Sequence, residues 1–349
     1  MHVLRPVLFA SVLAVAFPSA SQSWAVQHTD STALFIGLFA VTPDIVWASG
    51  TAGRVARTSD GGAHWTVTRV PGADSLQFRD VHAFSATEAF VLSIGNGTDS
   101  RIYHTTDGGA TWRLSFRNED PGAFFDCLSF WDRQRGFAVS DSRNGEFTLI
   151  ETANGGTTWT RIDPARVPDA RPGEGAFAAS GTCVVTRPGG LGWVATGASG
   201  VDTRVLRTHD YGATWTESVT PVTSRSGGEG LTSLSFLDDA NGVAFGGTLG
   251  GADSAFANVI RTTDGGRTWV LTGGQALGGV VYGGSVVPGA ATLTLVAVGP
   301  SGTAMSADGG ATWRQMNEAN TWTVTFLSPT AGWSAGRGHI SRFVPGNAQ

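Results

Sequence analysis

Apolar residues in this chain fall into short runs separated by Gly, Asp and Asn. The segments CLSFWDRQRGFAVSD (127–141), SLSFLDDANGVAFGG (233–247) and VTFLSPTAGWSAGRG (324–338) each read as an apolar strand, a polar turn and a second strand led by glycine. VHAFSATEAFVLS (81–93) is a weaker copy. Runs of this length between turn residues are typical of β-strands. The pattern predicts an all-β protein.

A turn motif recurs after these segments. Its six copies are TSDGGAHW (58–65), TTDGGATW (105–112), TANGGTTW (152–159), THDYGATW (208–215), TTDGGRTW (262–269) and SADGGATW (306–313). Successive copies begin 44 to 56 residues apart. That period fits a unit of four short strands and their turns, as in a propeller blade.

Each copy has the chemistry of a tight hairpin. The Asp or Asn is expected to accept hydrogen bonds from amides two residues on, the glycines allow positive φ, and the Trp begins the return strand. Residues repeated in every unit cannot all line one active site, so their predicted role is structural. They are Asp60, Asp107, Asn154, Asp210, Asp264, Asp308, Trp65, Trp112, Trp159, Trp215, Trp269 and Trp313.

The units number seven although the turn motifs number six. The last unit, from about Trp322 to Phe343, has no turn motif and no outer strand of its own. An exposed strand edge invites aggregation. WAVQHT (24–29) resembles the Trp-led outer strands and is expected to cover that edge. The prediction is a seven-bladed β-propeller whose ring is closed by the N-terminal strand.

The start of the chain resembles a secretory signal. Arg5 precedes an apolar stretch over 7–17, and Pro18 then leads into small residues. We expect residues 1–20 to be the signal peptide, with cleavage after Ala25 as the alternative, and residues 21–349 to form one domain. No later apolar run approaches membrane length. A periplasmic or secreted protein, without a transmembrane segment and monomeric, is expected.

Charge and motifs exclude several functions. The formal net charge is −5 and there is no basic stripe, so nucleic acid is not an expected partner. The chain has no metalloprotease, nucleophile-elbow, phosphate-loop or dinucleotide signature, so no cofactor is expected and no metal site is assigned.

The six turns resemble the Asp-box (BNR) repeat of sialidases and other propellers. FFDCLSFWDRQRGFAVSD (124–141) and GEGAFAASGTCVV (173–185) resemble the bacterial branch of the photosystem II stability and assembly factor family. The resemblance implies an exported seven-bladed propeller. Relatives in photosynthetic organisms act as assembly chaperones, and many bacterial relatives are labelled glycosyl hydrolases.

Function is expected on the face opposite the repeated turns, where the connections at 161–176, 219–230, 246–258 and 271–282 are long and irregular. Strand order places four carboxylates near that mouth of the central channel, with Arg143 and Arg225 near enough to pair with some of them. The candidate catalytic residues are Asp126, Asp141, Glu174 and Glu229. Such a cluster could act on a glycoside or hold a hard cation.

Two cysteines, Cys127 and Cys183, each stand nine residues before the glycine that opens the next strand of their units. They are therefore expected at equal depths on adjacent inner strands. A disulfide depends on the Cα separation, and two separate buried thiols are the alternative.

Two functions follow from this reading. The favoured one is a binding or assembly module that docks a protein or glycan partner on its loop-rich face, without catalysis. The alternative is a glycoside hydrolase that uses the carboxylates at the channel mouth. A sialidase is not expected. Its nucleophile is a tyrosine that acts beside an arginine cluster, and this chain has only Tyr282 placed near the channel and no sialidase-like arginine motif.

Overall fold

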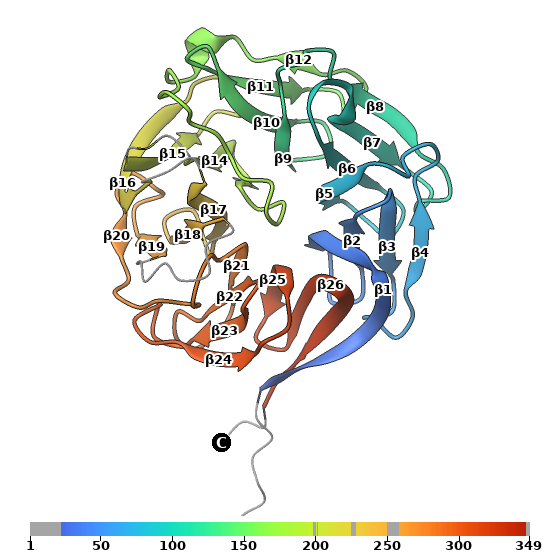
Figure 1. Cartoon of the computed structure of the whole chain (residues 1–349), viewed down its shortest axis with the longest axis vertical. Helices are drawn as coiled ribbons and strands as arrows, with labels where there is room; N and C mark the ends of the chain where they lie inside the picture. Colours follow the sequence, from blue (N-terminus) through green and yellow to red (C-terminus); the bar gives the residue numbers. More distant parts are fainter. Residues whose placement is uncertain (1–21, 198–199, 201, 225–227, 250–257, 347–349) are drawn as a thin grey trace, which may run out of the picture.

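The computed structural model describes residues 22–197, 200, 202–224, 228–249 and 258–346. The predicted signal peptide and Arg225 therefore lie outside the described residues. Sheets are arranged around a central axis (Figure 1), and the described part of the chain contains no α-helix. The two helical elements described are the short 3-10 turns η1 (Gly97–Asp99) and η2 (Pro164–Arg166). The all-β propeller prediction is confirmed.

Hydrogen bonding joins the described strands into six sheets, of which one has six strands and five have four. The six-stranded sheet contains, in spatial order, β25 (Thr321–Ser328), β26 (Ala331–Val344), β1 (Ser23–Ala40), β2 (Val46–Gly50), β3 (Arg54–Thr58) and β4 (Thr66–Arg69).

The four-stranded sheets run outward from strands β5, β9, β13, β17 and β21. Their strands are β5 (Gln77–Ala83), β6 (Ala89–Ile94), β7 (Arg101–Thr105) and β8 (Arg113–Arg117); β9 (Phe125–Phe130), β10 (Gly136–Arg143), β11 (Glu146–Thr152) and β12 (Thr160–Arg161); β13 (Val184–Arg187), β14 (Leu191–Ala195), β15 (Asp202–Thr208) and β16 (Thr216–Thr223); β17 (Glu229–Phe236), β18 (Gly242–Thr248), β19 (Val259–Thr262) and β20 (Val270–Leu271); β21 (Gly283–Val286), β22 (Leu295–Gly299), β23 (Gly302–Ser306) and β24 (Arg314–Asn317).

The prediction of seven blades was wrong, because the described strands make six sheets. The reason lies in β1, a continuous strand of 18 residues that pairs with β26 through its first half and with β2 through its second half. The first and last repeat units therefore share one sheet. The pairing itself is the expected one, since the WAVQHT segment lies against the C-terminal strand with Trp24 opposite Phe343.

The six repeated turns have the same hydrogen bonds. In each, the Asp or Asn side chain accepts a bond of 2.9 Å from the amide four residues later, as Asp107 does from Thr111. The sequence correctly predicted the Asp or Asn side chain as the acceptor, but it placed the donor amide two residues later and not four. The Thr or Ser that opens the motif accepts from the amide of the glycine four residues later, as Thr105 does from Gly109.

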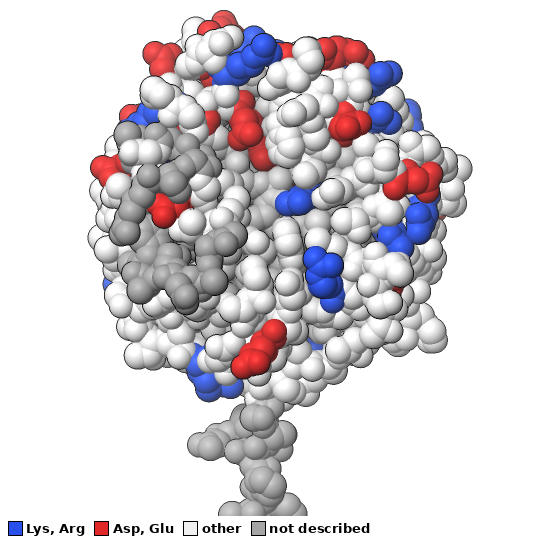
Figure 2. All heavy atoms as spheres, in the orientation of Figure 1, with Lys and Arg blue, Asp and Glu red and all other residues white. Residues whose placement is uncertain are grey.

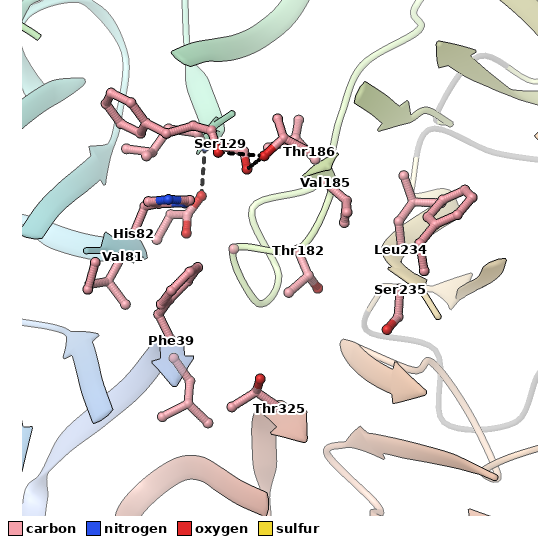
Figure 3. A pocket seen from close by; sticks show the side chains of 18 of the residues that line it. Phe39, Val81, His82, Ser129, Thr182, Val185, Thr186, Leu234, Ser235 and Thr325 are labelled. Atoms are coloured by element: carbon pink, nitrogen blue, oxygen red, sulfur yellow. Dashed lines mark hydrogen bonds between the residues drawn. The ribbon is translucent and has the colours of Figure 1, made fainter. Parts of the chain in front are cut away.

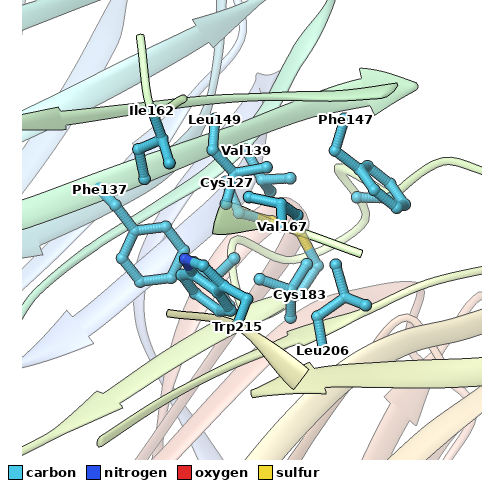
Figure 4. Packing of buried hydrophobic residues seen from close by; sticks show 13 residues of the cluster. Cys127, Phe137, Val139, Phe147, Leu149, Ile162, Val167, Cys183, Leu206 and Trp215 are labelled. Carbon is cyan, nitrogen blue, oxygen red and sulfur yellow. A yellow bond between two sulfur atoms is a disulfide. The ribbon is translucent and has the colours of Figure 1, made fainter. Parts of the chain in front are cut away.

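The core consists of apolar layers between neighbouring sheets. In the layer between the β9–β12 and β13–β16 sheets, Phe137 packs edge-on against Trp215 with ring centroids 5.2 Å apart (Figure 4). Cys127 and Cys183 lie in the same layer and form a disulfide, with Cα atoms 6.1 Å apart. The equal depths expected from the sequence thus bring the sulfur atoms together.

Candidate functional site at the channel mouth

Strand direction brings two of the predicted carboxylates to one end of the central channel. Asp126 is the second residue of β9, and Asp141 lies near the end of the antiparallel strand β10. The start of an inner strand and the end of its neighbour meet at the same edge of the sheet. The repeated turn that follows β11 stands at the opposite edge, so the carboxylates occupy the face predicted to carry function.

A cavity of about 470 Å³ lies at this mouth. Asp126, Asp141 and Arg79 are among the residues that line it. A second cavity of about 170 Å³ shares Arg79 with the first and adds the rings of Tyr282 and Trp322. We call the first the acidic compartment, the second the aromatic compartment, and the two together the mouth site.

Burial dominates the chemistry of the carboxyl pair. Asp126 is 2% exposed, and its Oδ2 atom accepts no hydrogen bond from the described residues. Burial, and then the charge of Asp141, raise the pKa of Asp126 well above its usual range, against the opposing effects of the Ala178 amide and Arg79. Burial likewise raises the pKa of Asp141 to about 6, although the Ala176 amide donates to its Oδ1 at 3.1 Å. Carboxyl groups in such surroundings can hold a proton or receive a cation near neutral pH.

Arg79 stands between the two compartments. Its Nη1 donates to the Ala178 carbonyl at 2.9 Å, and its Nη2 donates to Gln77 at 3.2 Å. The guanidinium lies over the ring of Trp322, 5.2 Å from the centroid, and Trp322 in turn packs against Tyr282 at 4.4 Å. The mouth site therefore combines an acidic pair, one cation and an aromatic wall.

The floor of the mouth site is an irregular segment, residues 177–182, that we call the plug. Its Ala178 carbonyl binds Arg79 of β5, and Thr323 of β25 donates to its Ser180 carbonyl at 3.3 Å. The amide of Leu234 in β17 donates to its Thr182 carbonyl at 2.8 Å. The plug thus contacts strands from several sheets across the channel, and the disulfide fixes its downstream end.

On the other side of the plug the channel contains a cavity of about 670 Å³ (Figure 3). His82 lines it and lies among the rings of Phe39, Phe84 and Phe130, at centroid distances of 4.5, 5.0 and 5.3 Å. Burial lowers the pKa of His82 to about 3, so its imidazole is neutral at physiological pH.

Glu174 has a structural environment. Its carboxylate is buried against Arg204, which donates to both oxygens at 2.7 and 2.6 Å, and it also accepts from the Thr196 hydroxyl at 2.6 Å and the Arg171 amide at 2.9 Å. Both oxygens of the Glu174 carboxylate are therefore hydrogen-bonded within the protein, although Glu174 lines the acidic compartment. Asp126 and Asp141 line the same compartment, and neither forms an ion pair with another described residue.

The remaining predicted residues lie elsewhere. Glu229 begins β17 and accepts from the Thr248 hydroxyl at 3.0 Å, and it is not among the described residues that line either compartment. Arg143 pairs with Asp120 at 2.6 Å, so the prediction that it would pair with a candidate carboxylate was wrong. The four carboxylates therefore do not form one cluster.

Charges on the face shown in Figure 2 are of both signs, and most stand toward its periphery. No group of three or more His, Cys, Asp or Glu side chains suited to a metal ion occurs among the described residues. Within the same residues, no helix has the length and apolar character needed to span a membrane.

Comparison with known proteins supports the resemblance seen in the sequence. Residues 17–128 match the family described as photosynthesis system II assembly factor YCF48. The first third of the chain is thus similar to photosystem II assembly factor-like proteins. The predicted resemblance is thereby confirmed, while no curated protein sequence matches the chain significantly.

Solved structures share the fold across nearly the whole chain. The structure of YCF48 bound to D1 peptide is 18% identical, with a TM-score of 0.63, covering 96% of this chain and 99% of that one. An ancestral GH74 enzyme is 14% identical with a TM-score of 0.62, covering 92% of this chain and 46% of the enzyme. A streptogramin B lyase is 12% identical with a TM-score of 0.61, covering 95% and 99%. Identities this low establish the architecture alone.

Sequence reasoning missed Arg79 and Trp322, although a signal for their region existed. Asp126 stands four residues before Phe130, the phenylalanine that ends its inner strand. Trp322 stands at the same distance before Phe326 in the last unit. Aligning the inner strands on this phenylalanine would have placed Trp322 at the channel mouth with Asp126.

Proposed function

We propose that the protein is an exported, monomeric binding module that docks a segment of a protein partner at the mouth site. The observation that carries the proposal is the preformed pair of compartments, in which Arg79 and Trp322 stand beside the buried Asp126 and the half-buried Asp141. Concave sites with an apolar wall and a few convergent polar groups are typical of ligand pockets. Export rests on the signal-like leader of the sequence.

The residue types favour a protein partner. Trp, Tyr and Arg are the residues enriched among the side chains that dominate binding energy at protein interfaces, and the mouth site has one of each. A peptide segment could lay an apolar side chain on Trp322 and Tyr282 and donate backbone hydrogen bonds toward the acidic compartment. The similar propeller solved with a D1 peptide shows that this architecture can hold a peptide.

The test is capture of a partner from an extract of the source organism by purified protein, followed by peptide mapping of what is captured. Arg79→Ala and Trp322→Ala are each expected to weaken binding by tenfold or more, about 1.4 kcal/mol or greater. Arg117→Ala is the matched control, because Arg117 is an exposed arginine on the outer strand β8. Equal capture by wild type and by both mouth variants would refute the proposal, and capture of a glycan in place of a protein would redirect it.

The carboxyl pair favours a second candidate, a glycoside hydrolase. Two carboxyl groups in one cavity, with the pKa of Asp141 at about 6, are groups that could act as acid and base on a glycosidic bond. Purified protein assayed on a panel of chromogenic glycosides tests it. Turnover that disappears in Asp126→Asn and Asp141→Asn would support this function. No turnover on any member of the panel would count against the hydrolase and favour the binding module.

A further inference from the structure

The acidic compartment contains a buried acceptor that the fold does not pair. Asp126 is almost fully buried, and its Oδ2 accepts nothing from the described residues. A buried carboxylate oxygen without a donor is costly, and most such groups in proteins are hydrogen-bonded. The rest of the carboxyl pair receives amide bonds only, from Ala178 to Asp126 and from Ala176 to Asp141. The pair lines the cavity and includes one acceptor atom that no described residue pairs.

The charge of Arg79 only partly offsets the effect of burial on the pKa of Asp126. Arg79 lines the same cavity, yet its two hydrogen-bonded nitrogens serve the Ala178 carbonyl and Gln77. No ion pair within 4 Å joins either aspartate to an arginine among the described residues, where Arg143 and Arg204 are taken by other acids. Two neighbouring carboxyl groups in a cavity favour a positively charged guest.

The backbone is shaped to keep the carboxyl groups in place. A Cβ atom at Gly175 would approach Asp141 Oδ1 within 2.1 Å, so only glycine lets Asp141 lie where it does. The disulfide holds Cys127, the neighbour of Asp126, to Cys183 beyond the plug. The pair is thus a built feature of the mouth, held by side-chain, backbone and covalent contacts.

The walls suit a side chain with an apolar stem. Phe177 and Leu249 line both compartments, and Trp322 and Tyr282 line the smaller one. Lys and Arg side chains lay their methylene stems along apolar surface and present a charged head. A stem on Phe177 and Leu249 would direct its head toward the carboxyl pair.

We infer that the acidic compartment accepts the ammonium or guanidinium group of a lysine or arginine side chain from the docked segment. The inference rests on the proposed function, and it names the residue type that the mouth site selects. Neighbouring residues of the segment lie against the aromatic compartment. Asp126 and Asp141 are the specificity-determining residues in this scheme.

The test uses pools of synthetic peptides in which one central position is fixed as Lys, Arg, norleucine or Glu and the other positions are randomised. Binding of each pool is measured with wild-type protein, with Asp126→Asn/Asp141→Asn, and with Asp120→Asn. Asp120 is half-exposed and pairs with Arg143, which makes it a matched acidic control. The asparagines keep the shape of the carboxyl groups, and circular dichroism with thermal unfolding checks that the double variant is folded.

Wild type and Asp120→Asn are expected to bind the Lys and Arg pools about tenfold more tightly than the norleucine pool, with the double variant binding all pools equally. In competition, n-butylammonium should release the bound Lys pool while n-butanol does not. Equal binding of the Lys and norleucine pools by wild type, or a Lys preference that survives in the double variant, would overturn the inference and leave peptide docking standing. Failure of every pool to bind would count against both this inference and the proposed function. If the double variant does not fold, the competition experiment on wild type decides.

Discussion

Cys127, in the inner strand β9, is bonded to Cys183, which stands directly after the plug. One end of the plug is therefore attached to the strand that carries Asp126. The plug also makes hydrogen bonds to the ring, such as the one from Arg79 to the Ala178 carbonyl. Because the mouth site is built on the plug, this covalent cross-link helps to fix its geometry.

Removing the disulfide should lower stability substantially. The bond spans a sequence separation of 56 residues, for which loop-closure entropy gives a stabilisation of about 4 kcal/mol. Urea unfolding of Cys127→Ser/Cys183→Ser is expected to show a loss of about 2–5 kcal/mol against wild type. A reductant should destabilise wild type and leave the double variant unchanged. An unchanged midpoint in the double variant would contradict the prediction.

The Glu174–Arg204 pair should be more sensitive to losing one member than to losing both. Both side chains are almost fully buried and are joined by two short hydrogen bonds. Breaking a buried pair leaves an uncompensated charge, at a cost of about 3–5 kcal/mol. Arg204→Met should therefore destabilise the protein by that amount, and adding Glu174→Gln should recover part of the loss. Chemical unfolding of the three proteins measures this, and a double variant less stable than Arg204→Met would refute it.

The repeated turns should make stability sensitive to acid. Hydrogen bonds from the following residues lower the pKa of Asp60, Asp107 and Asp308 to about 2. Since an unfolded aspartate titrates near about 4, this contribution is complete above pH of about 4 and is lost as the pH falls toward about 2. Asn154 shows that asparagine can make the same backbone bond, from Thr158.

Replacing Asp60, Asp107 and Asp308 together by Asn should keep the turns and remove this pH dependence. At pH 7 the triple variant is expected to melt roughly 2 °C lower per replaced residue, because the neutral amide is a weaker acceptor than the carboxylate. At pH 2 the two proteins should melt together. Thermal unfolding across this range is the measurement, and a constant difference at every pH would argue against the prediction.

The effect of Asp141 on the pH dependence of stability should be opposite to that of the aspartates in the repeated turns. Burial raises its pKa to about 6, so the folded chain holds a proton that the unfolded chain releases at pH of about 4. Stability should therefore fall as the pH rises from about 4 to about 6. Asp141→Asn is expected to flatten that fall by roughly 2 kcal/mol, measured by urea unfolding at several pH values. Parallel pH profiles of the two proteins would show that Asp141 titrates normally.

The sequence predicted what depends on local spacing. The turn around Asp107 needs only its own eight residues, and strand order then placed Asp126 and Asp141 at one edge. The structural role of Glu174 could not be predicted, because it depends on an ion pair with Arg204. That arginine is 30 residues away in the sequence, and no local pattern indicates the contact. The plug has no periodic pattern of hydrophobic residues from which it could be predicted. Its residues form hydrogen bonds with strands of several sheets. The number of sheets was missed because β1 continues through a point where the repeats predict a break.

The strand β1 has a consequence for how the chain is made. Its first residues pair with β26, which lies at the far end of the sequence, so Trp24 finds Phe326 and Phe343 only after nearly the whole polypeptide has been synthesised. Until that moment the ring stands open, with an unpaired edge at each end. The period between translation and closure is then the time at which a newly made chain is most exposed to aggregation and to proteases.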